Sequence, residues 1–190
     1  MPPAPTEGHA AIATPSPWIE RFAPLIPREA RVLDVASGHG RHARFFAARG
    51  NPVVAVDRDA GALAALAGVP GVQARIVDLE TGGRVLGDER FDAILVVNYL
   101  HRPLLADLLD ALADDGVLLY ETFAQGNEAF GRPRNPDFLL APDELLQRIG
   151  GRLTIVAFEQ GHVATPAPGV VIQRLAAVGA GRGWPPPLPL

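Results

Sequence analysis

The chain has 190 residues, a formal net charge of −4 at pH 7 and no cysteine, which excludes disulfides, thiolate zinc sites, cysteine nucleophiles and cysteine-bound iron–sulfur clusters. Hydrophobic residues make up 48% of the chain, yet no apolar stretch approaches the ~20 residues needed to cross a bilayer. With no leader-like segment at the N-terminus, we expect a cytoplasmic protein without a membrane partner, and the acidic balance favours a small-molecule partner over a nucleic acid.

Proline-rich segments at both ends, residues 1–17 and 181–190, are expected to be flexible tails around one domain over residues 18–180. Hydrophobic periodicity and helix boundary residues predict the elements of the first half: a helix at 18–26, a strand at 31–35, a helix at 40–49, a strand at 52–56, a helix at 59–66 and a strand at 72–77. The second half predicts a strand at 91–97, a helix starting at Pro103, a strand at 116–121, a helix over 141–151 and strands at 152–159 and 170–178.

This alternation of strands and helices predicts an α/β fold with a doubly wound, mostly parallel, seven-stranded sheet. Residues 91–97 are apolar on both faces, as is typical of a strand in the middle of a parallel sheet. No helix separates the last two strands, so we expect them to form an antiparallel hairpin at one edge of the sheet.

A glycine loop over residues 34–40 follows the first strand and leads into a helix. Gly38 and Gly40 allow the backbone to turn tightly and to approach a ligand. The helix N-terminus behind them offers free N–H groups and a positive dipole end, which suit a carboxylate or a phosphate. Because Gly38, Gly40 and Ala43 also fit the dinucleotide fingerprint, the loop alone does not identify its ligand.

Two further acids, Asp57 and Asp78, end the second and third strands. In a doubly wound sheet they lie at the same edge as Asp34, around the binding crevice. Asp57 suits the two hydroxyls of a ribose, Asp78 suits the amine of an adenine, and Asp34 suits a cationic amino group. Each acid alone could instead be a capping or solvated residue. Together they favour S-adenosylmethionine over NAD, whose pyrophosphate would stand near Asp34.

The segment over residues 31–178 resembles class I S-adenosylmethionine-dependent methyltransferases. VLDVASGHGRHARFFA is similar to the glycine motif of that family, VAVDRD to its ribose-binding acid and VDLE to its adenine-contacting segment. The residues expected to bind the cofactor are Asp34, Ala36, Gly38, Gly40, Asp57, Arg58, Asp78, Leu79 and Asn98. Ala36 stands where the family motif often has its first glycine. YETFAQGNEAFGRPRNPDFLLAPDELL resembles small methyltransferases related to the tellurite-resistance group.

The acceptor is expected over the ends of the fourth and fifth strands. A sulfonium methyl group is already activated, so the protein mainly aligns the acceptor and excludes water, and a base is optional. His101 is a candidate general base or a helix cap, and Tyr99 a candidate pocket or core residue. The chain lacks the Asn/Asp-Pro-Pro-aromatic element of amino-methylating DNA enzymes after this strand, which disfavours a base amine as the acceptor.

The segment over residues 122–140 is long for a loop in a compact domain, and such loops often cover a site. Arg132 and Arg134 would hold an anionic acceptor there, or would form a solvated basic loop. The candidate substrate contacts are Glu121, Phe123, Asn127, Arg132 and Arg134. No metal is expected, because His39 and His42 have no acidic partner at ligand spacing.

The leading hypothesis is methyl transfer from S-adenosylmethionine to a small-molecule acceptor, which includes metalloids. Two alternatives are a non-catalytic S-adenosylmethionine-binding module that regulates a partner, and an NAD-dependent oxidoreductase suggested by the fingerprint match. The sequence names neither the acceptor nor an oligomeric state.

Overall fold

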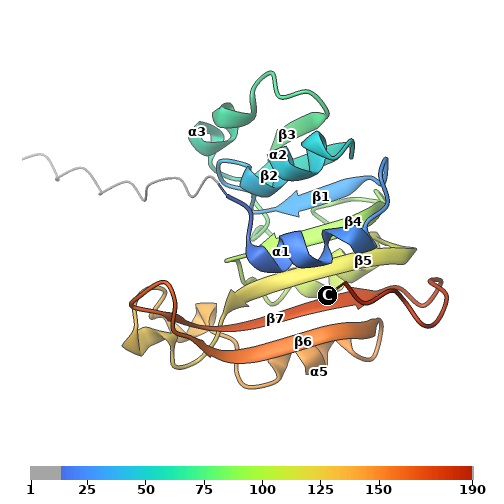
Figure 1. Cartoon of the computed structure of the whole chain (residues 1–190). Coiled ribbons are helices and arrows are strands. Elements are labelled where there is room, and N and C mark those ends of the chain that lie inside the picture. Colours follow the sequence, from blue (N-terminus) through green and yellow to red (C-terminus); the bar gives the residue numbers. More distant parts are fainter. Residues whose placement is uncertain (1–13, 190) are drawn as a thin grey trace, which may run out of the picture.

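The computed structural model describes residues 14–189, so most of the predicted N-terminal tail lies outside the described residues. Figure 1 shows one central sheet with helices packed against it. The strands are β1 (Val32–Val35), β2 (Val53–Asp57), β3 (Val72–Ile76), β4 (Phe91–Val97), β5 (Leu112–Phe123), β6 (Thr154–Val163) and β7 (Val170–Val178). The helices are α1 (Pro17–Phe22), α2 (Arg41–Ala48), α3 (Ala60–Leu63), α4 (Leu104–Ala111) and α5 (Glu144–Ile149). Four 3₁₀ turns are η1 (Ala23–Leu25), η2 (Ala64–Leu66), η3 (Asn127–Ala129) and η4 (Pro136–Phe138).

The sheet has the strand order β3-β2-β1-β4-β5-β7-β6. β1 pairs in parallel with β2 and β4, β2 with β3, and β4 with β5. β7 pairs antiparallel with both β5 and β6. The predicted α/β class, the mostly parallel seven-stranded sheet and the antiparallel edge hairpin are therefore confirmed, with β6 as the outer strand of the hairpin.

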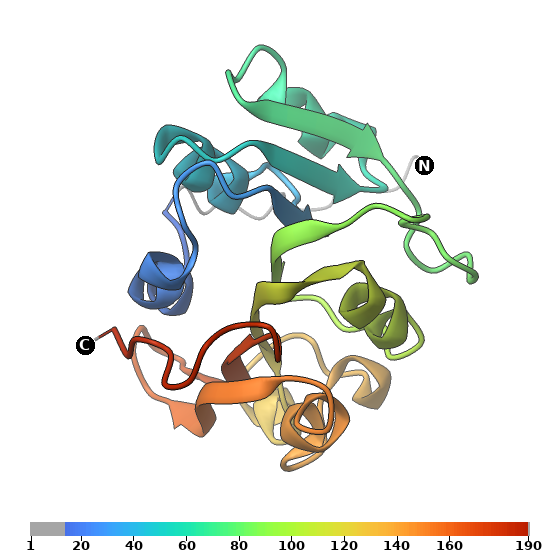
Figure 2. The same ribbon diagram turned by 90° about the vertical axis from the view of Figure 1, so that its right-hand side faces the viewer.

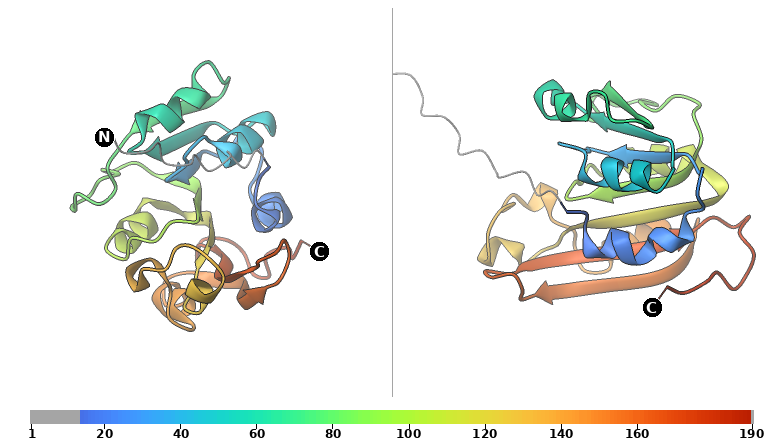
Figure 3. Two further views of the ribbon diagram at one scale, coloured as in Figure 1. Left: turned by 90° about the vertical axis from the view of Figure 1, so that its left-hand side faces the viewer. Right: turned by 45° about the horizontal axis from the view of Figure 1, so that its top comes forward.

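Helices cover both faces of the sheet, as Figures 2 and 3 show from the two sides. One core lies under α1, α2 and η2 and contains Trp18, Phe46 and Leu66. The other lies under α4 and α5 and contains Leu108 and Leu145. Successive strand residues point to opposite faces, so every strand except β3 contributes to both cores. Of the edge strand β3, only Val72 packs against a core.

The leading helix α1 is tied to the sheet by polar contacts at its start. Ser16 Oγ accepts a hydrogen bond of 3.1 Å from the backbone N–H of Trp18, and Trp18 Nε1 donates to the backbone oxygen of Leu175 at 3.1 Å. α1 ends at Phe22 and continues as a 3₁₀ turn to Leu25, so regular helix is shorter than the predicted 18–26. Pro24 causes this change, because it has no N–H to continue the α-helical ladder.

The fifth strand extends beyond its prediction at both ends. β5 starts at Leu112 rather than at residue 116, and its register against β4 shifts between Phe91 and Ala93. The sequence Asp114-Asp115-Gly116 looks like a turn, but it forms an irregular start to the strand. Leu112, which directly follows α4, is the strand's first residue and pairs with Phe91.

The predicted division into a domain and two tails stays a prediction. Residues on both sides of the predicted domain contact it: Ser16 caps α1, and Arg182 Nη2 donates to the backbone oxygen of Leu25 at 2.7 Å. Within residues 14–189, no helix is both long and apolar enough to span a membrane.

Candidate functional site

A pocket of about 380 Å³ lies at the carboxyl ends of the parallel strands. Its size suits a small molecule, and its position is the crevice in which doubly wound sheets bind ligands. Its wall is formed by residues at or just after the ends of β1, β2, β3, β4 and β5, together with the long segment after β5. These residues are Ala36, Asp57, Arg58, Val77, Asp78, Leu79, Glu80, Asn98, Tyr99, Leu100, Thr122, Phe123, Pro133 and Phe138.

The pocket brings together about half of the residues predicted from the sequence: Ala36, Asp57, Arg58, Asp78, Leu79, Asn98, Tyr99 and Phe123. The other predicted residues do not line it: Asp34, Gly38, Gly40, His101, Glu121, Asn127, Arg132 and Arg134. Sequence reasoning missed Val77, Glu80, Leu100, Thr122, Pro133 and Phe138. Most of these are direct neighbours of predicted residues, and Pro133 and Phe138 belong to the segment predicted to cover the site.

The glycine loop needs its two glycines for different reasons. Gly38 and Gly40 have φ angles of +53° and +74°, in the left-handed region. A Cβ on Gly38 would meet no atom within 4 Å, whereas a Cβ on Gly40 would lie 2.3 Å from Leu66 Cδ2. Gly40 therefore permits close packing of the loop on η2, and Gly38 leaves open space beside the backbone. Ala36 adopts a left-handed φ of 51° without being a glycine.

Asp57 is fixed at the pocket wall by two backbone donors. Its Oδ2 accepts a hydrogen bond of 2.8 Å from the N–H of Gly38, and its Oδ1 accepts one of 2.9 Å from the N–H of Asp59. A carboxylate has about four acceptor positions, so both oxygens can still accept hydroxyl donors from a ligand. Asp59 caps α3 by accepting from the N–H groups of Gly61 and Ala62, as predicted.

Asp78 lies across the pocket from the glycine loop in the turn after β3. Its Oδ1 accepts a hydrogen bond of 2.9 Å from the N–H of Glu80, which leaves the exposed carboxylate in a fixed orientation. Leu79 is buried beside it. Arg58 Nη1 lies 3.8 Å from Glu80 Oε2, and both side chains are substantially exposed. Such an exposed pair contributes less than about 1 kcal/mol and forms an open polar rim.

Asp34 lies below the loop and is buried, with 1% of its surface exposed. Its Oδ2 accepts a hydrogen bond of 3.0 Å from the N–H of Ala43 in α2. Burial raises the pKa of Asp34 to about 7; the Ala43 hydrogen bond and the charge of Arg41 oppose this rise, and Asp57 adds to it. The expected contact with a cationic amino group stays a prediction, and its strength would depend on the ionisation of this carboxyl group.

His42 holds the leading segment over the start of α2. Its Nε2 accepts a hydrogen bond of 3.2 Å from the N–H of Ser16, and its Nδ1 lies 3.9 Å from Asp34 Oδ1. Burial, followed by the charge of Arg41, lowers the pKa of His42 to about 3, so the imidazole is neutral. Over residues 14–189, no three or more histidine or acidic side chains are grouped in a way that could hold a metal ion.

Glu121, a predicted substrate contact, lies outside the pocket wall. Its Oε1 accepts a hydrogen bond of 2.8 Å from Ser16 Oγ, and its Oε2 lies 3.4 Å from Arg174 Nη1. Arg174 also pairs with Glu159 and lies over the Trp18 ring at 4.8 Å. These contacts place Glu121 in a polar network that joins the leading segment to β5 and β7.

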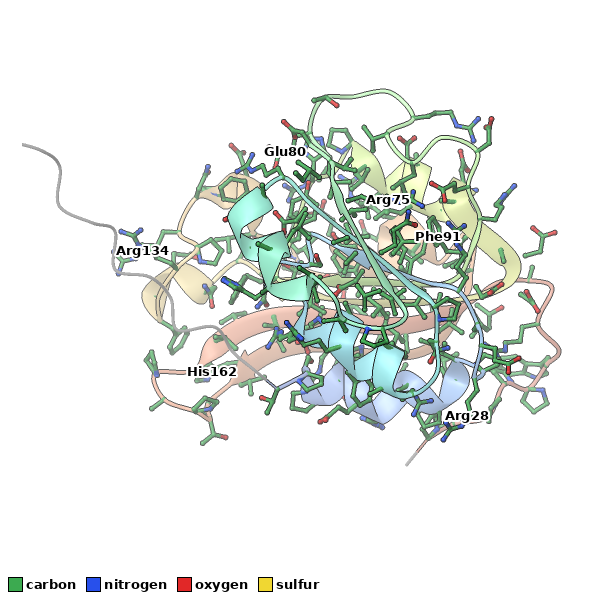
Figure 4. The ribbon with its side chains drawn as sticks, turned by 90° about the horizontal axis from the view of Figure 1, so that it is seen from above. Arg28, Arg75, Glu80, Phe91, Arg134 and His162 are labelled. Carbon is green, nitrogen blue, oxygen red and sulfur yellow. The ribbon has the colours of Figure 1, made fainter. Side chains whose placement is uncertain are left out.

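Other predicted acceptor contacts also have partners within the protein. Asn127 is buried, and its Oδ1 accepts from the N–H of Val171 at 3.1 Å while its Nδ2 donates to the oxygen of Pro133 at 3.2 Å. Arg132 and Arg134 are exposed, and Figure 4 shows Arg134 at the outer side of the molecule. The two arginines are not among the residues that line the pocket, although Pro133 between them is, and their predicted contact with an anionic acceptor stays a prediction.

The two catalytic candidates have different positions. Tyr99 lines the pocket, and its hydroxyl is buried without a hydrogen-bond partner among the described residues. Burial raises the pKa of Tyr99 to about 12, with a further rise from the charge of Glu80, so its phenol keeps its proton near neutral pH. His101 is outside the wall of the pocket, and its backbone oxygen accepts from the N–H of Leu104 at the start of α4.

Proteins of known structure share this fold. The chain resembles an S-adenosylmethionine-dependent methyltransferase from Methanosarcina mazei with a TM-score of 0.65 and 13% identity, covering 87% of this chain and 98% of that one. TehB from Haemophilus influenzae aligns with a TM-score of 0.69 and 15% identity over 85% of this chain and 61% of TehB. At these identities the likeness shows the fold.

A third structure is 1,6-didemethyltoxoflavin-N1-methyltransferase from Burkholderia thailandensis, with bound 1,6-didemethyltoxoflavin and S-adenosylhomocysteine. It aligns with a TM-score of 0.62 and 22% identity over 85% of this chain and 76% of that one. No curated protein matches the chain by sequence. The sequence does match a family described as a methyltransferase domain over residues 8–162, which is most of the chain. The resemblance to class I methyltransferases is thereby confirmed, and the chain belongs to this methyltransferase domain family.

Proposed function

We propose that the protein transfers a methyl group from S-adenosylmethionine to a small-molecule acceptor. The observation that carries the proposal is that Asp57 and Asp78, from adjacent strand ends, line one pocket whose other side has no charged side chain among its lining residues. This order of groups suits a nucleoside at one end of the pocket and a reacting centre at the other. S-adenosylmethionine dependence is also the property named for several structures that share the fold.

The residues present fit this donor. Asp57 has free acceptor capacity for the ribose hydroxyls, and Asp78 is held with its carboxylate exposed for the adenine amine. Leu79 and Arg58 would flank the adenine ring. Beside Gly38 there is open space where a side chain would otherwise stand, which lets a ligand approach the backbone. Asp34 would hold the amino group from below the loop.

When bound, S-adenosylmethionine supplies an electrophilic methyl carbon: a lone pair of the acceptor forms the new bond, the S–C bond breaks with its electrons staying on sulfur, and an acceptor proton leaves to solvent. The protein's own contribution is to orient the two reactants and to exclude water. Tyr99 keeps its proton and so acts as a hydrogen-bond donor rather than as a base. His101 is not among the residues that line the pocket, so the proposal assigns it no role as a base.

Calorimetry with S-adenosylhomocysteine tests the donor site directly, because this product binds without turnover. We expect binding with one site per chain and no binding of NADH. Mass spectrometry with isotopically labelled S-adenosylmethionine and a panel of oxygen, nitrogen, sulfur and metalloid acceptors then tests transfer. Binding of NADH without binding of S-adenosylhomocysteine would contradict the proposal. The predicted cytoplasmic location and the absence of a nucleic-acid partner stay predictions.

A further inference from the structure

The pocket has two halves of different chemistry. Charged residues lie on the half formed after β2 and β3, where Asp57, Arg58, Asp78 and Glu80 stand. The half formed at the ends of β4 and β5 contains no charged side chain among its lining residues, which are Asn98, Tyr99, Leu100, Thr122, Phe123, Pro133 and Phe138. If the donor occupies the charged half, as proposed above, the acceptor faces an uncharged wall whose outer part, formed by Phe123, Pro133 and Phe138, is apolar.

The ends of the segment that carries much of this wall, the lid segment (residues 124–140), are joined by backbone pairing. Ala124 and Leu140 form a parallel bridge, the N–H of Gln125 donates to Leu140 O at 2.9 Å, and the N–H of Leu140 donates to Phe123 O at 3.0 Å. Phe130 of this segment stacks on His162 of β6 with ring centroids 4.2 Å apart. The lid segment is therefore folded against the sheet rather than extended into solvent.

Arg102 fixes the part of the lid segment that carries Phe138. Its Nη1 donates to Asp137 O at 2.7 Å and its Nη2 to Leu139 O at 2.9 Å, so it holds the peptides on both sides of that ring. Its Nε and Nη2 also form a bidentate pair with Glu144 at 2.7 and 2.9 Å. The pKa of Glu144 is lowered to about 2, mainly by the hydrogen bonds from Arg102. Partial burial opposes this shift, and hydrogen bonds from the Ala141 N–H and from Arg148 add to it.

Asn127 fixes the position of Pro133, the other residue of the lid segment that lines the pocket. Its side chain bridges Val171 of β7 and the oxygen of Pro133, so the sheet positions Pro133 at the pocket. Phe138 lines the pocket and stays 49% exposed, so the rest of the protein does not cover its ring. A large apolar ring that is left uncovered at the wall of a pocket is available for contact with a ligand. This indicates a ligand contact for Phe138 rather than a core role.

We infer that the acceptor is a neutral, planar, apolar small molecule, such as a heteroaromatic ring, which packs against Phe138, Pro133 and Phe123. Arg102 and Asn127 are positioning residues for this wall. The inference rests on the proposed function, because it assigns the charged half of the pocket to the donor. A ring stacked on Phe138 gains from apolar burial and from aromatic geometry, whereas an anion or a metalloid oxyanion would lose hydration there, and the residues that line this half of the pocket include no cation.

The test uses the full chain saturated with S-adenosylhomocysteine and measures binding of quinolin-8-ol, 2-naphthol and benzenethiol, with tellurite as the anionic comparison. We expect binding of at least one planar compound and none of tellurite. Phe138→Ala and Arg102→Gln should each weaken that binding at least about fivefold. Arg148→Gln is the matched control, since Arg148 pairs with the same Glu144 oxygen as Arg102, whereas the hydrogen bonds to the lid segment come from Arg102.

Hydrogen exchange at residues 137–140 gives a second measurement. We expect faster exchange in Arg102→Gln and unchanged exchange in Arg148→Gln and Phe138→Ala, with S-adenosylhomocysteine affinity the same in all four proteins. Loss of S-adenosylhomocysteine binding by the wild type would reject the proposed function itself. The inference about the acceptor would be overturned by any of three results obtained with normal S-adenosylhomocysteine binding. These are binding of tellurite alone, binding of no planar compound, and equal binding of the planar compound by Phe138→Ala and the wild type.

Discussion

The carboxylate of Asp57 accepts a hydrogen bond of 2.8 Å from the backbone N–H of Gly38, and this contact joins the end of β2 to the loop after β1. The same side chain therefore shapes the glycine loop and faces the pocket. A residue with both tasks links the conformation of the loop to donor binding.

Replacing Asp57 by alanine removes the loop contact and the acceptor for the ribose hydroxyls together. We expect the Kd of S-adenosylhomocysteine to rise at least about tenfold, because a charged hydrogen-bond acceptor is lost at the ligand. Isothermal titration calorimetry measures the change. Asp59→Ala is the control: it removes the cap of α3 and costs about 1 kcal/mol of stability, but should leave the affinity unchanged. Equal affinities of Asp57→Ala and the wild type would refute the assignment.

Ala36 provides a prediction about stability. Its left-handed φ of 51° is unfavourable for a residue with a Cβ, and glycine relieves that cost. Ala36→Gly should raise the free energy of unfolding by about 0.5–1 kcal/mol, after allowance for the greater freedom of glycine in the unfolded chain. Ala48→Gly, at the exposed end of α2, should lower it by about 0.5–1 kcal/mol. Urea unfolding distinguishes the two, and a loss of stability in Ala36→Gly would contradict the argument.

The two glycines of the loop should differ in their tolerance of alanine. Gly38→Ala costs about 1 kcal/mol from backbone conformation alone, since its Cβ would meet open space. Gly40→Ala adds an overlap with Leu66 and should cost about 1–3 kcal/mol more. Combining Gly40→Ala with Leu66→Ala tests the cause in a double-mutant cycle. Additive effects of these two substitutions would show that Leu66 is not the obstacle.

Asp34 predicts a dependence of stability on pH. Its pKa rises from an ordinary value of 3.8 to about 7 in the folded protein, so the unfolded chain loses this proton first as the pH rises. The contribution of Asp34 to folding stability is full below about pH 4 and is lost as the pH rises through about 7. Asp34→Asn does not titrate, so its stability relative to the wild type should increase over this range, by at most about 4 kcal/mol.

Urea unfolding at several pH values measures this difference between variant and wild type. Asp88→Asn removes a carboxylate whose side chain is 92% exposed and controls for the change in net charge. A difference between Asp34→Asn and the wild type that stays constant from about pH 4 to about pH 8 would show that the carboxyl group is ionised throughout.

The sheet and its donor end were predictable because they depend on short-range patterns. The apolar runs of β1, β2 and β4 identify parallel strands, and the carboxyl ends of such strands share one edge, so Asp57 and Asp78 had to lie near each other. The start of β5 was not predictable, because the polar Asp114 and Asp115 resemble a turn and pairing with β4 overrides that local preference.

The acceptor end depends on partners far away in the sequence. Arg102 acts through Glu144, 42 residues later, and Asn127 through Val171, 44 residues later. Composition and hydrophobic periodicity do not predict hydrogen bonds between residues so far apart in the sequence. The sequence therefore predicts Asn127 as a substrate contact, whereas its amide hydrogen-bonds to Val171 and Pro133 within the protein. No local pattern distinguishes Phe138. The burial of Asp34 likewise depends on α2 packing over it.

The bridge between Ala124 and Leu140 brings the two ends of the lid segment side by side, which makes that segment a closed insertion in the chain. Its interior can change in length and composition without altering the strands that hold it. Relatives with the same sheet and the same carboxylates can thus gain specificity for new acceptors through changes in the lid segment alone. A chimeric protein that carries the lid segment of another family member would keep its donor site intact.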